Sequence, residues 1–458
     1  MKFSRMIARF LVKNLFSFKE LTEFNMLPGR FNRMDHHVYQ TGGIGILKIN
    51  AMYGANGAGK SNLIKSLSLL KQFVVTGDLP IEFLLETFKF DPESRTKDVY
   101  LGVEFIKNEI PYYYGITINQ GIVVEEELAI SGLGRKDDHY LFQRTDKADQ
   151  KDLTVTFSPD LLIEQENAFV PRFLQNQLLQ RNQPVLHYTR ILGHPVFDPL
   201  LNALDWFNED LVTIMPSYKH ASLAIQLEAD KAFYAFATDV MQSFDTGIQS
   251  IKIDTIPIED FFGEDDKQQA ERITAELKSN PDRVKPIITN DEEIIFVLNK
   301  KGRAFAKRLS FVHDTDGGVE KFTAAEESDG TRRLLDYLPA FYTAIKFGGV
   351  FLIDEIERSI HPLLIKELLN KFSHDKSTKG QIIFSTHESN LLDQDIFRPD
   401  EIWFAEKNMG ETKVTPLSEF KEHHTIDIRK GYLNGRYGGI PFLGNLKNLN
   451  WDKYAEAN

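Results

Sequence analysis

Cysteine is absent from this chain of 458 residues, and its absence excludes several kinds of site at once. Without thiols there can be no disulfide, no thiolate zinc site, no iron–sulfur cluster and no cysteine nucleophile. Long apolar runs are missing too, because no segment approaches the ~20 residues that a membrane-spanning helix needs. We therefore expect a cytoplasmic protein with no membrane partner.

An excess of positive charge is also lacking. The chain has 54 Lys and Arg against 66 Asp and Glu, which gives a formal net charge of −12. A net-acidic protein is not a general nucleic-acid coat, so any contact with DNA or RNA needs a local basic patch. The hydrophobic content of 42% is enough for sizeable cores and excludes a mostly disordered chain.

Hydrophobic periodicity predicts a mixed α/β fold. We expect a lobe with a β-rich part over residues 1–160, a helical insertion over 161–245 and a second lobe over 246–458. The expected strands are 7–15, 44–52, 99–105, 112–118, 122–128, 248–253, 294–298, 309–313, 350–353 and 381–385. The expected helices are 203–212, 221–244, 329–346, one after residue 61 and one from Pro362.

The strongest motif follows the expected strand 44–52 and opens a helix. It is a full Walker A pattern, whose predicted nucleotide-binding residues are Gly54, Ala55, Asn56, Gly57, Ala58, Gly59, Lys60, Ser61 and Asn62. Glycines let the backbone curl so that its N–H groups and the helix N-terminus hold phosphates. Lys60 would reach the β- and γ-phosphates, and the Ser61 hydroxyl would ligate Mg²⁺. The motif predicts ATP and Mg²⁺ as cofactors.

A second motif is the apolar run 350–353, which ends in Asp354 and Glu355. In open α/β sheets, ligands bind at the carboxyl ends of the strands. We expect Asp354 to hold the Mg²⁺ shell and Glu355 to orient and deprotonate the attacking water. A strand that ends in two acids is common by itself. With the Walker A motif upstream, it indicates a site for Mg²⁺ and hydrolysis.

Two further features complete the predicted site. Ser328, Gly330 and Thr331 stand at the start of the helix 329–346, where hydroxyl and backbone donors make a second phosphate cradle. An ordinary helix N-cap at Ser328 is the structural alternative. His387 follows the strand 381–385 and is predicted to sense the γ-phosphate as a catalytic residue. A satisfied structural histidine is the alternative there.

Together these residues resemble the ABC-type ATPase heads of the SMC, RecF and OLD lineage. Within it, the chain is similar to stand-alone AAA-family ATP-binding proteins of bacterial phage-defence operons. Supporting segments are 10–18, the loop 54–62, Asp354–Pro362 and the tail 432–441. The resemblance covers both ends of the chain and covers 160–320 poorly. It implies an ABC head, a P-loop sheet with a flanking antiparallel β subdomain, carrying a helical insertion.

The resemblance also implies partners. Two copies would sandwich ATP between the Walker A loop of one and the Ser328 helix of the other, as a homodimer or a larger oligomer of dimers. The dimer would act as a sensor or switch for a separate effector, such as a Toprim-, RloB- or HEPN-like nuclease encoded nearby. Alternatives are an ATPase that acts directly on nucleic acid in DNA repair, and a binding module without turnover.

Weaker features are expected to be structural. About 70 residues follow His387, too few for a nuclease domain of ordinary size, so we expect no Toprim nuclease within the chain. Five bases at 300–308 predict a solvated hairpin, with a docking surface for DNA or an acidic partner as the alternative. The adjacent pairs His36-His37 and His423-His424 are not expected to bind metal, because neighbouring side chains diverge.

Overall fold

The computed structural model divides the chain into two compact units. The first unit consists of Met1–Thr213, Phe347–Ile356 and Ser373–Asn458, and the second of Ile214–Lys346 and Glu357–Phe372. The residues described are 4–31, 33–146, 153–163, 169–244, 246–264, 266–280, 284–288, 293–299, 301–315, 317–420 and 427–439. In this part of the chain, no helix has the length and apolar character that crossing a membrane requires. The three-segment division at residues 160 and 245 stays a prediction.

A six-stranded sheet forms the centre of the first unit. Its order is β11-β17-β18-β5-β19-β20, and the pairs β17/β18, β18/β5 and β5/β19 are parallel. The strands are β5 (Ile49–Tyr53), β11 (Leu211–Ile214), β17 (Val350–Ile353), β18 (Gln381–Thr386), β19 (Ile402–Asn408) and β20 (Glu411–Pro416). Every residue of β5, β17 and β18 is buried, which explains the continuous apolar sequence of β17 and the apolar stretches of the other two.

A seven-stranded antiparallel sheet accompanies it in the same unit, in the order β10-β9-β8-β7-β6-β1-β2. Its strands are β1 (Arg5–Lys13), β2 (Thr22–Asn25), β6 (Val99–Lys107), β7 (Ile110–Asn119), β8 (Ile122–Ile130), β9 (His139–Thr145) and β10 (Thr154–Phe157). The buried side chain of Gln381 ties the two sheets together. Its amide oxygen accepts from the Ile7 N–H at 2.6 Å, and its Nε2 donates to the Ile7 and Leu47 carbonyls at 3.0 and 2.8 Å.

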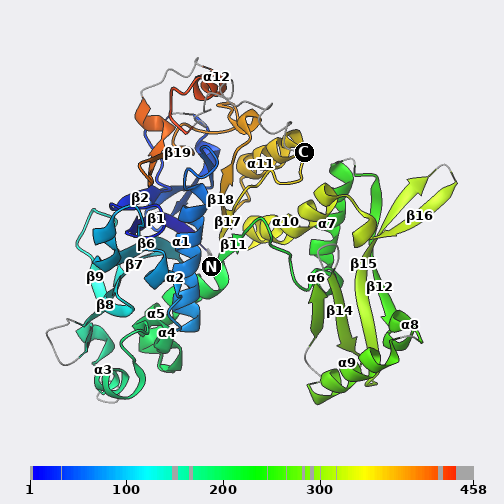
Figure 1. Cartoon of the computed structure of the whole chain (residues 1–458), viewed down its shortest axis with the longest axis horizontal. Coiled ribbons are helices and arrows are strands. Elements are labelled where there is room, and N and C mark those ends of the chain that lie inside the picture. The colour runs from blue at the N-terminus through cyan, green and yellow to red at the C-terminus, as the bar shows by residue number, and fades with distance from the viewer. Residues whose placement is uncertain are drawn as a thin grey trace, which may run out of the picture. The chain divides into compact units, whose positions relative to one another are not determined.

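The remaining elements of the first unit are a hairpin of β3 (Val38–Thr41) and β4 (Ile44–Leu47), and several helices. The helices are α1 (Lys60–Thr76), α2 (Glu82–Leu85), α3 (Val170–Phe173), α4 (Val185–Tyr188), α5 (Asp198–Asp205) and α12 (Ile428–Leu433). The predicted fold class is confirmed: the chain is α/β, with a parallel sheet that carries the glycine-rich loop and an antiparallel sheet beside it (Figure 1).

The second unit contains a separate antiparallel sheet and its own core (Figure 1). Its strands are β12 (Ile248–Pro257), β13 (Lys285–Ile288), β14 (Glu293–Leu298), β15 (Ala304–Thr315) and β16 (Gly318–Thr323). Its helices are α6 (Leu223–Ala229), α7 (Lys231–Ser243), α8 (Ile258–Phe262), α9 (Lys267–Ser279), α10 (Asp329–Lys346) and most of α11 (Pro362–His374). Ile258, Ile273 and Leu277 pack with Phe296 in a buried cluster, which holds α8 and α9 on the sheet.

Several predicted elements are confirmed in place, and three were wrong in extent. The predicted helix 329–346 and strand 350–353 are α10 and β17. The predicted strand 44–52 is two strands, β4 and β5, interrupted at Lys48, whose Nζ donates to the Asp375 carbonyl at 3.1 Å. The predicted helix 203–212 ends earlier, because Leu211 already begins β11 in the central sheet.

The third difference is the predicted helix 221–244, which is split into α6 and α7. Asp230 stands between them with an extended backbone (φ −112°, ψ 100°), and its carboxylate accepts from the N–H groups of Ala232 and Phe233. A short acidic side chain competes with helical hydrogen bonding in this way, so the chain stops one helix and caps the next. The predicted hairpin is formed by β14 and β15, while Lys300 in its turn lies outside the described residues.

Candidate functional site

Three chemistry-bearing segments leave the central sheet at one edge. In the parallel register, Thr386 of β18 lies opposite Tyr53 of β5, and Phe384 lies opposite Ile353 of β17. The glycine-rich loop follows Tyr53, Asp354 and Glu355 follow Ile353, and His387 follows Thr386. Because parallel strands end on the same side, segments that are some 300 residues apart come together here.

Three glycines of the loop have positive φ, and at two of them, Gly54 and Gly59, a side chain would also clash with a neighbouring strand. Gly54 has φ +157°, and a Cβ there would lie 2.5 Å from the carbonyl oxygen of Ala405 in β19. Gly59 has φ +106°, and a Cβ there would lie 2.1 Å from Thr412 Oγ1 in β20. Only a residue without a side chain meets both demands. The loop is thus seated directly on the neighbouring strands of the sheet.

Lys60, the first residue of α1, is folded back over the loop and is only 4% exposed. Its Nζ donates to the carbonyl oxygens of Gly54 and Ala55 at 2.7 and 3.1 Å. The same Nζ lies 3.2 Å from each ring nitrogen of His387. The structure therefore brings the predicted lysine and the predicted histidine into contact within the loop.

Ser61 and Asp354 also meet. Ser61 Oγ donates to Asp354 Oδ1 at 2.9 Å, and Ser385 Oγ donates to the same oxygen at 2.5 Å. Asp354 is 3% exposed, so the carboxylate is held in one orientation by these two hydroxyls. A hydroxyl and a carboxylate oxygen at this separation are the hard ligands that Mg²⁺ takes, so the residues fit that ion.

Glu355 has an unusual backbone conformation. Its φ is +53°, in the left-handed region that non-glycine residues seldom adopt. Its N–H donates to Ser385 Oγ at 2.9 Å, and the N–H of Ile356 donates to the Ser385 carbonyl at 3.1 Å. Strain of this kind persists only where surrounding contacts hold it, and it often accompanies functional sites.

A second layer of polar contacts supports the loop. Asn62, predicted to bind nucleotide, donates from Nδ2 to Ser17 Oγ at 2.8 Å. Thr412 Oγ1 lies within hydrogen-bond distance of two oxygens, Ser17 Oγ at 2.7 Å and the Ala58 carbonyl at 2.8 Å. Asn56 and Gly57, at the tip of the loop, are exposed.

Sequence reasoning did not find Ser17, Ser385 or Thr412. Ser385 lies two residues before His387, so its place at the strand end was a usable signal. Ser17 and Thr412 carry no local signal, because their role comes from a contact across 395 residues of chain. Their hydrogen bonds hold the loop in shape, and they do so from outside the motif.

The predicted second cradle lies in the second unit. Ser328 Oγ accepts from the Thr331 N–H at 3.1 Å and lies 2.8 Å from Thr331 Oγ1, so Ser328 caps α10. Gly330 allows a close approach, since a Cβ there would lie 2.6 Å from the carbonyl oxygen of Ser359. Ser328 is therefore the N-cap residue of α10, a helix of 18 residues that begins at Asp329.

The edge of the central sheet thus carries an ammonium group, an oxygen pair suited to a divalent cation, a carboxylate and an imidazole. These are the groups that phosphoryl transfer needs, because positioning and charge stabilisation make up most of that catalysis.

Three solved structures resemble the chain at low identity. They are the SMC head domain from Thermotoga maritima (12% identity, 90% of this chain and 98% of that one, TM-score 0.37), an SmcHead bound to the C-winged helix domain of ScpA (11%, 91% and 99%, 0.42), and an Smc head domain with an extended coiled coil bound to the C-terminal domain of ScpA derived from Pyrococcus furiosus (12%, 91% and 97%, 0.37). These TM-scores describe a distant likeness. No curated protein matches the sequence.

A family model matches the sequence itself over residues 49–393, and its description is "AAA domain, putative AbiEii toxin, Type IV TA system". The matched span starts with β5 and runs past His387, so it contains the glycine-rich loop, Asp354, Glu355 and Ser328. Because this span is well over half of the 458 residues, the chain belongs to that family of AAA domains.

Proposed function

We propose that the chain binds ATP with Mg²⁺ at the edge of the central sheet and hydrolyses it to ADP and phosphate. The observation that carries the proposal is the contact of Ser61 Oγ with Asp354 Oδ1 at 2.9 Å. It joins the residue after the P-loop lysine to the acid that follows β17, and that pairing is what a nucleotide-bound Mg²⁺ requires.

The proposed roles follow from the contacts. Gly54 to Asn62 form the phosphate loop, and Lys60 exchanges its carbonyl partners for the β- and γ-phosphates. Ser61 and Asp354 would hold Mg²⁺, which would neutralise part of the negative charge of the phosphates. Glu355 acts as the base that takes a proton from the attacking water, and His387 contacts the γ-phosphate. The 3.2 Å approach of Lys60 to His387 supports a shared position for both groups at that phosphate.

The proposed second half of the site is the N-terminus of α10, with Ser328, Gly330 and Thr331. The N-terminus of this helix carries partial positive charge and backbone donors, which suit a γ-phosphate. We propose that it belongs to a second copy of the chain, so that two ATP molecules are enclosed by a symmetric dimer. Closure would then depend on the γ-phosphate and would switch the assembly between two states.

For the wider role, we propose a sensor or regulatory switch that controls a separate effector, in defence against phage. The family description, which names a toxin system, and the net charge of −12 support this role. A nuclease of Toprim, RloB or HEPN type remains the proposed effector. The same charge argues against a general nucleic-acid coat, and we propose a cytoplasmic protein.

The alternative is an ATPase that acts directly on DNA, through the basic residues of the β14–β15 hairpin. Two of those bases already have acidic neighbours. Lys307 pairs with Glu228, and Arg308 Nε lies 4.0 Å from Asp254, which also pairs with Lys321. Since these pairs neutralise part of the positive charge, the contacts favour the sensor role over a phosphate-binding hairpin.

Two variants of this site test the activity. Lys60→Ala should abolish ATP binding in calorimetry, whereas Lys65→Ala, on the exposed side of the same helix, should bind as the wild type does.

Glu355→Gln should retain ATP binding and reduce phosphate release by about 100-fold or more, with Glu93→Gln as the exposed control. Unchanged affinity in Lys60→Ala would refute the site, and full turnover in Glu355→Gln would refute the proposed base.

A further inference from the structure

Three histidines from two distant segments meet in the first unit. His36 and His37 lie in a 3-10 turn, Asp35–His37, just before β3, and His374 is the last residue of α11. One nitrogen of each ring lies within 4.8 Å of the others. The ring centroids of His36 and His374 are 4.4 Å apart, and those of His36 and His37 are 4.5 Å apart.

The expectation that His36 and His37 diverge was wrong. It holds for helices and strands, where successive side chains point to different sides. Here the turn starts from Met34 in the left-handed region, with φ +55°, and the two rings face each other edge to face at 77°. The tight turn brings both rings to the same side, where His374 joins them.

His37 has one nitrogen bound and one without a partner. Its side chain is 0% exposed, and Nδ1 lies 2.9 Å from both carboxylate oxygens of Glu401. In the tautomer whose Nδ1–H donates to Glu401, Nε2 carries the free lone pair. His37 Nε2 and His36 Nε2 are both buried atoms with no hydrogen-bond partner. Buried polar nitrogens are almost always paired, so these two nitrogens are available to a ligand.

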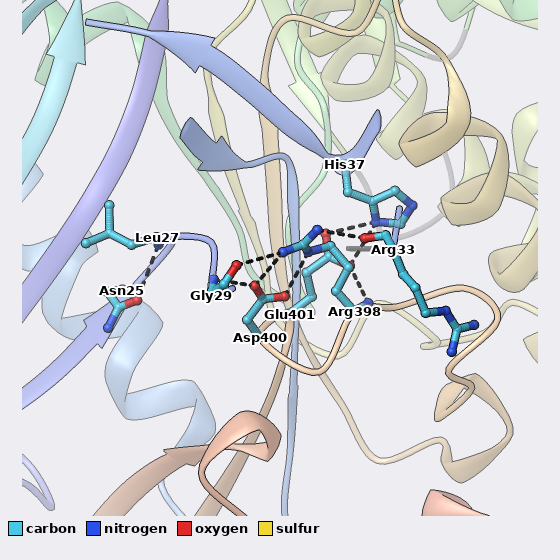
Figure 2. A network of polar contacts seen from close by, with 8 residues as sticks. All are labelled: Asn25, Leu27, Gly29, Arg33, His37, Arg398, Asp400 and Glu401. Atoms are coloured by element: carbon cyan, nitrogen blue, oxygen red, sulfur yellow. Dashed lines mark hydrogen bonds and ion pairs between the residues drawn. The ribbon is translucent and has the colours of Figure 1, made fainter. Parts of the chain in front are cut away.

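Glu401 is itself fixed by a network that Figure 2 shows. The backbone N–H of Arg398 donates to Glu401 Oε2 at 2.8 Å. The Arg398 guanidinium donates to both oxygens of Asp400 at 2.9 Å, and the Gly29 N–H donates to Asp400 Oδ2 at 2.6 Å. A carboxylate that orients one nitrogen of a histidine leaves the other nitrogen aimed at a metal in many metal sites.

Burial also keeps the ring of His37 neutral. Removal from water, with the neighbouring His36 second in importance, lowers the pKa of His37 to about 3. Burial likewise lowers the pKa of His36 below its usual value.

We propose that His36, His37 and His374 bind a transition-metal ion, Zn²⁺ in particular, at a site separate from the proposed nucleotide site. Imidazole nitrogens suit Zn²⁺ and not Mg²⁺ or Ca²⁺, which take oxygen ligands. Tetrahedral Zn–N bonds of about 2.0–2.1 Å place the nitrogens closer together than in the metal-free geometry, so the exposed His374 ring moves inward. The ion ties the turn 35–37 to the end of α11, and its fourth position is left for water or an added ligand.

The test uses the full chain without a histidine tag, stripped of metal and kept in excess Mg²⁺. We expect one Zn²⁺ per chain in calorimetry, and visible absorption bands of tetrahedral coordination with Co²⁺. His374→Ala removes the exposed one of the three ligands, and it should weaken Zn²⁺ binding by about 10-fold or more. His139→Ala, an exposed histidine whose side chain is 51% accessible, is the matched control and should bind as the wild type does.

His36→Gln, which keeps the bulk of the side chain, should weaken Zn²⁺ binding as His374→Ala does. Equal Zn²⁺ affinity in the wild type and in both variants would overturn the proposal. The same conclusion would follow if Co²⁺ gave no tetrahedral spectrum, or if Mg²⁺ displaced the bound metal. ATP hydrolysis is not a readout, so this result is independent of the proposed nucleotide site.

Discussion

Two glycines of the phosphate loop look alike in the motif but differ in their surroundings. Gly57 has φ +76° and no atom within 4 Å of a Cβ built on it. Gly59 has φ +106°, and Thr412 Oγ1 would lie 2.1 Å from its Cβ. Gly57 is therefore required only for its backbone conformation. Gly59 is required for its backbone conformation and also because Thr412 leaves no room for a side chain.

We expect the two alanine variants to differ accordingly. Gly57→Ala should lower the free energy of unfolding by about 1–2 kcal/mol, the cost of a side chain in the left-handed region. Gly59→Ala should lose about 2–5 kcal/mol, because overpacking against Thr412 is added to that strain. Denaturant unfolding followed by fluorescence would measure both. Equal losses would mean that the contact with Thr412 does not constrain the loop.

At the scale of elements, the junction of α6 and α7 is held by one side chain. The carboxylate of Asp230 caps α7 and accepts from the Tyr342 hydroxyl of α10 at 3.0 Å. The hydrogen bond from the Phe233 N–H is the main cause that lowers the pKa of Asp230 below its ordinary value of 3.8. The charged carboxylate is thus favoured in the folded second unit.

This arrangement predicts a pH-dependent stability. A carboxyl group with a lowered folded pKa stabilises the protein above its unfolded pKa of 3.8, and the contribution is lost as the pH falls through the folded pKa. Asp230→Asn keeps the cap and loses the charge, so its melting temperature should lie below that of the wild type at pH 7 and approach it in acid. Asp230→Ala should be the least stable of the three at pH 7. A constant gap between wild type and Asp230→Asn at every pH would contradict the assignment.

At the scale of the whole molecule, the two halves of the proposed ATP site lie in different compact units. Lys60 and Glu355 belong to the first unit, and Ser328 belongs to the second. Mixing two inactive variants can decide whether one copy or two copies build each site. In a dimer, a Lys60→Ala chain lends its Ser328 to the intact loop of a Ser328→Arg chain.

We expect an equimolar mixture of Lys60→Ala and Ser328→Arg to recover about a quarter of the wild-type ATPase rate, since half of the dimers hold one intact site of two. A mixture of Lys60→Ala with Glu355→Gln should stay inactive, because both residues lie in one unit of one chain. Ser328→Ala, which removes only the cap, shows how much of the loss is structural. Phosphate release measures all of these samples. No recovery in the first mixture would exclude a site shared between copies.

The sequence by itself predicted three strands of the central sheet, β5, β17 and β18, and the order of the functional segments that follow them, but not β11, β19 or β20. β17 is a continuous apolar run, and β5 and β18 contain shorter apolar stretches; this pattern is typical of buried parallel strands, which end at one edge. Local spacing was therefore enough to place Lys60, Asp354 and His387 near one another. The break at Asp230 was less predictable, since an acidic residue within a helical pattern can be either solvent-facing or a cap.

Only the tertiary structure decided which distant side chains support those segments. Thr412 reaches the Ala58 carbonyl across 354 residues, and His37 reaches Glu401 across 364. His374 joins His36 and His37 because the end of α11 comes to the turn before β3. Hydrophobic periodicity and glycine spacing predict structure only over short stretches of sequence. These contacts depend on how whole elements pack against one another, which no local pattern predicts.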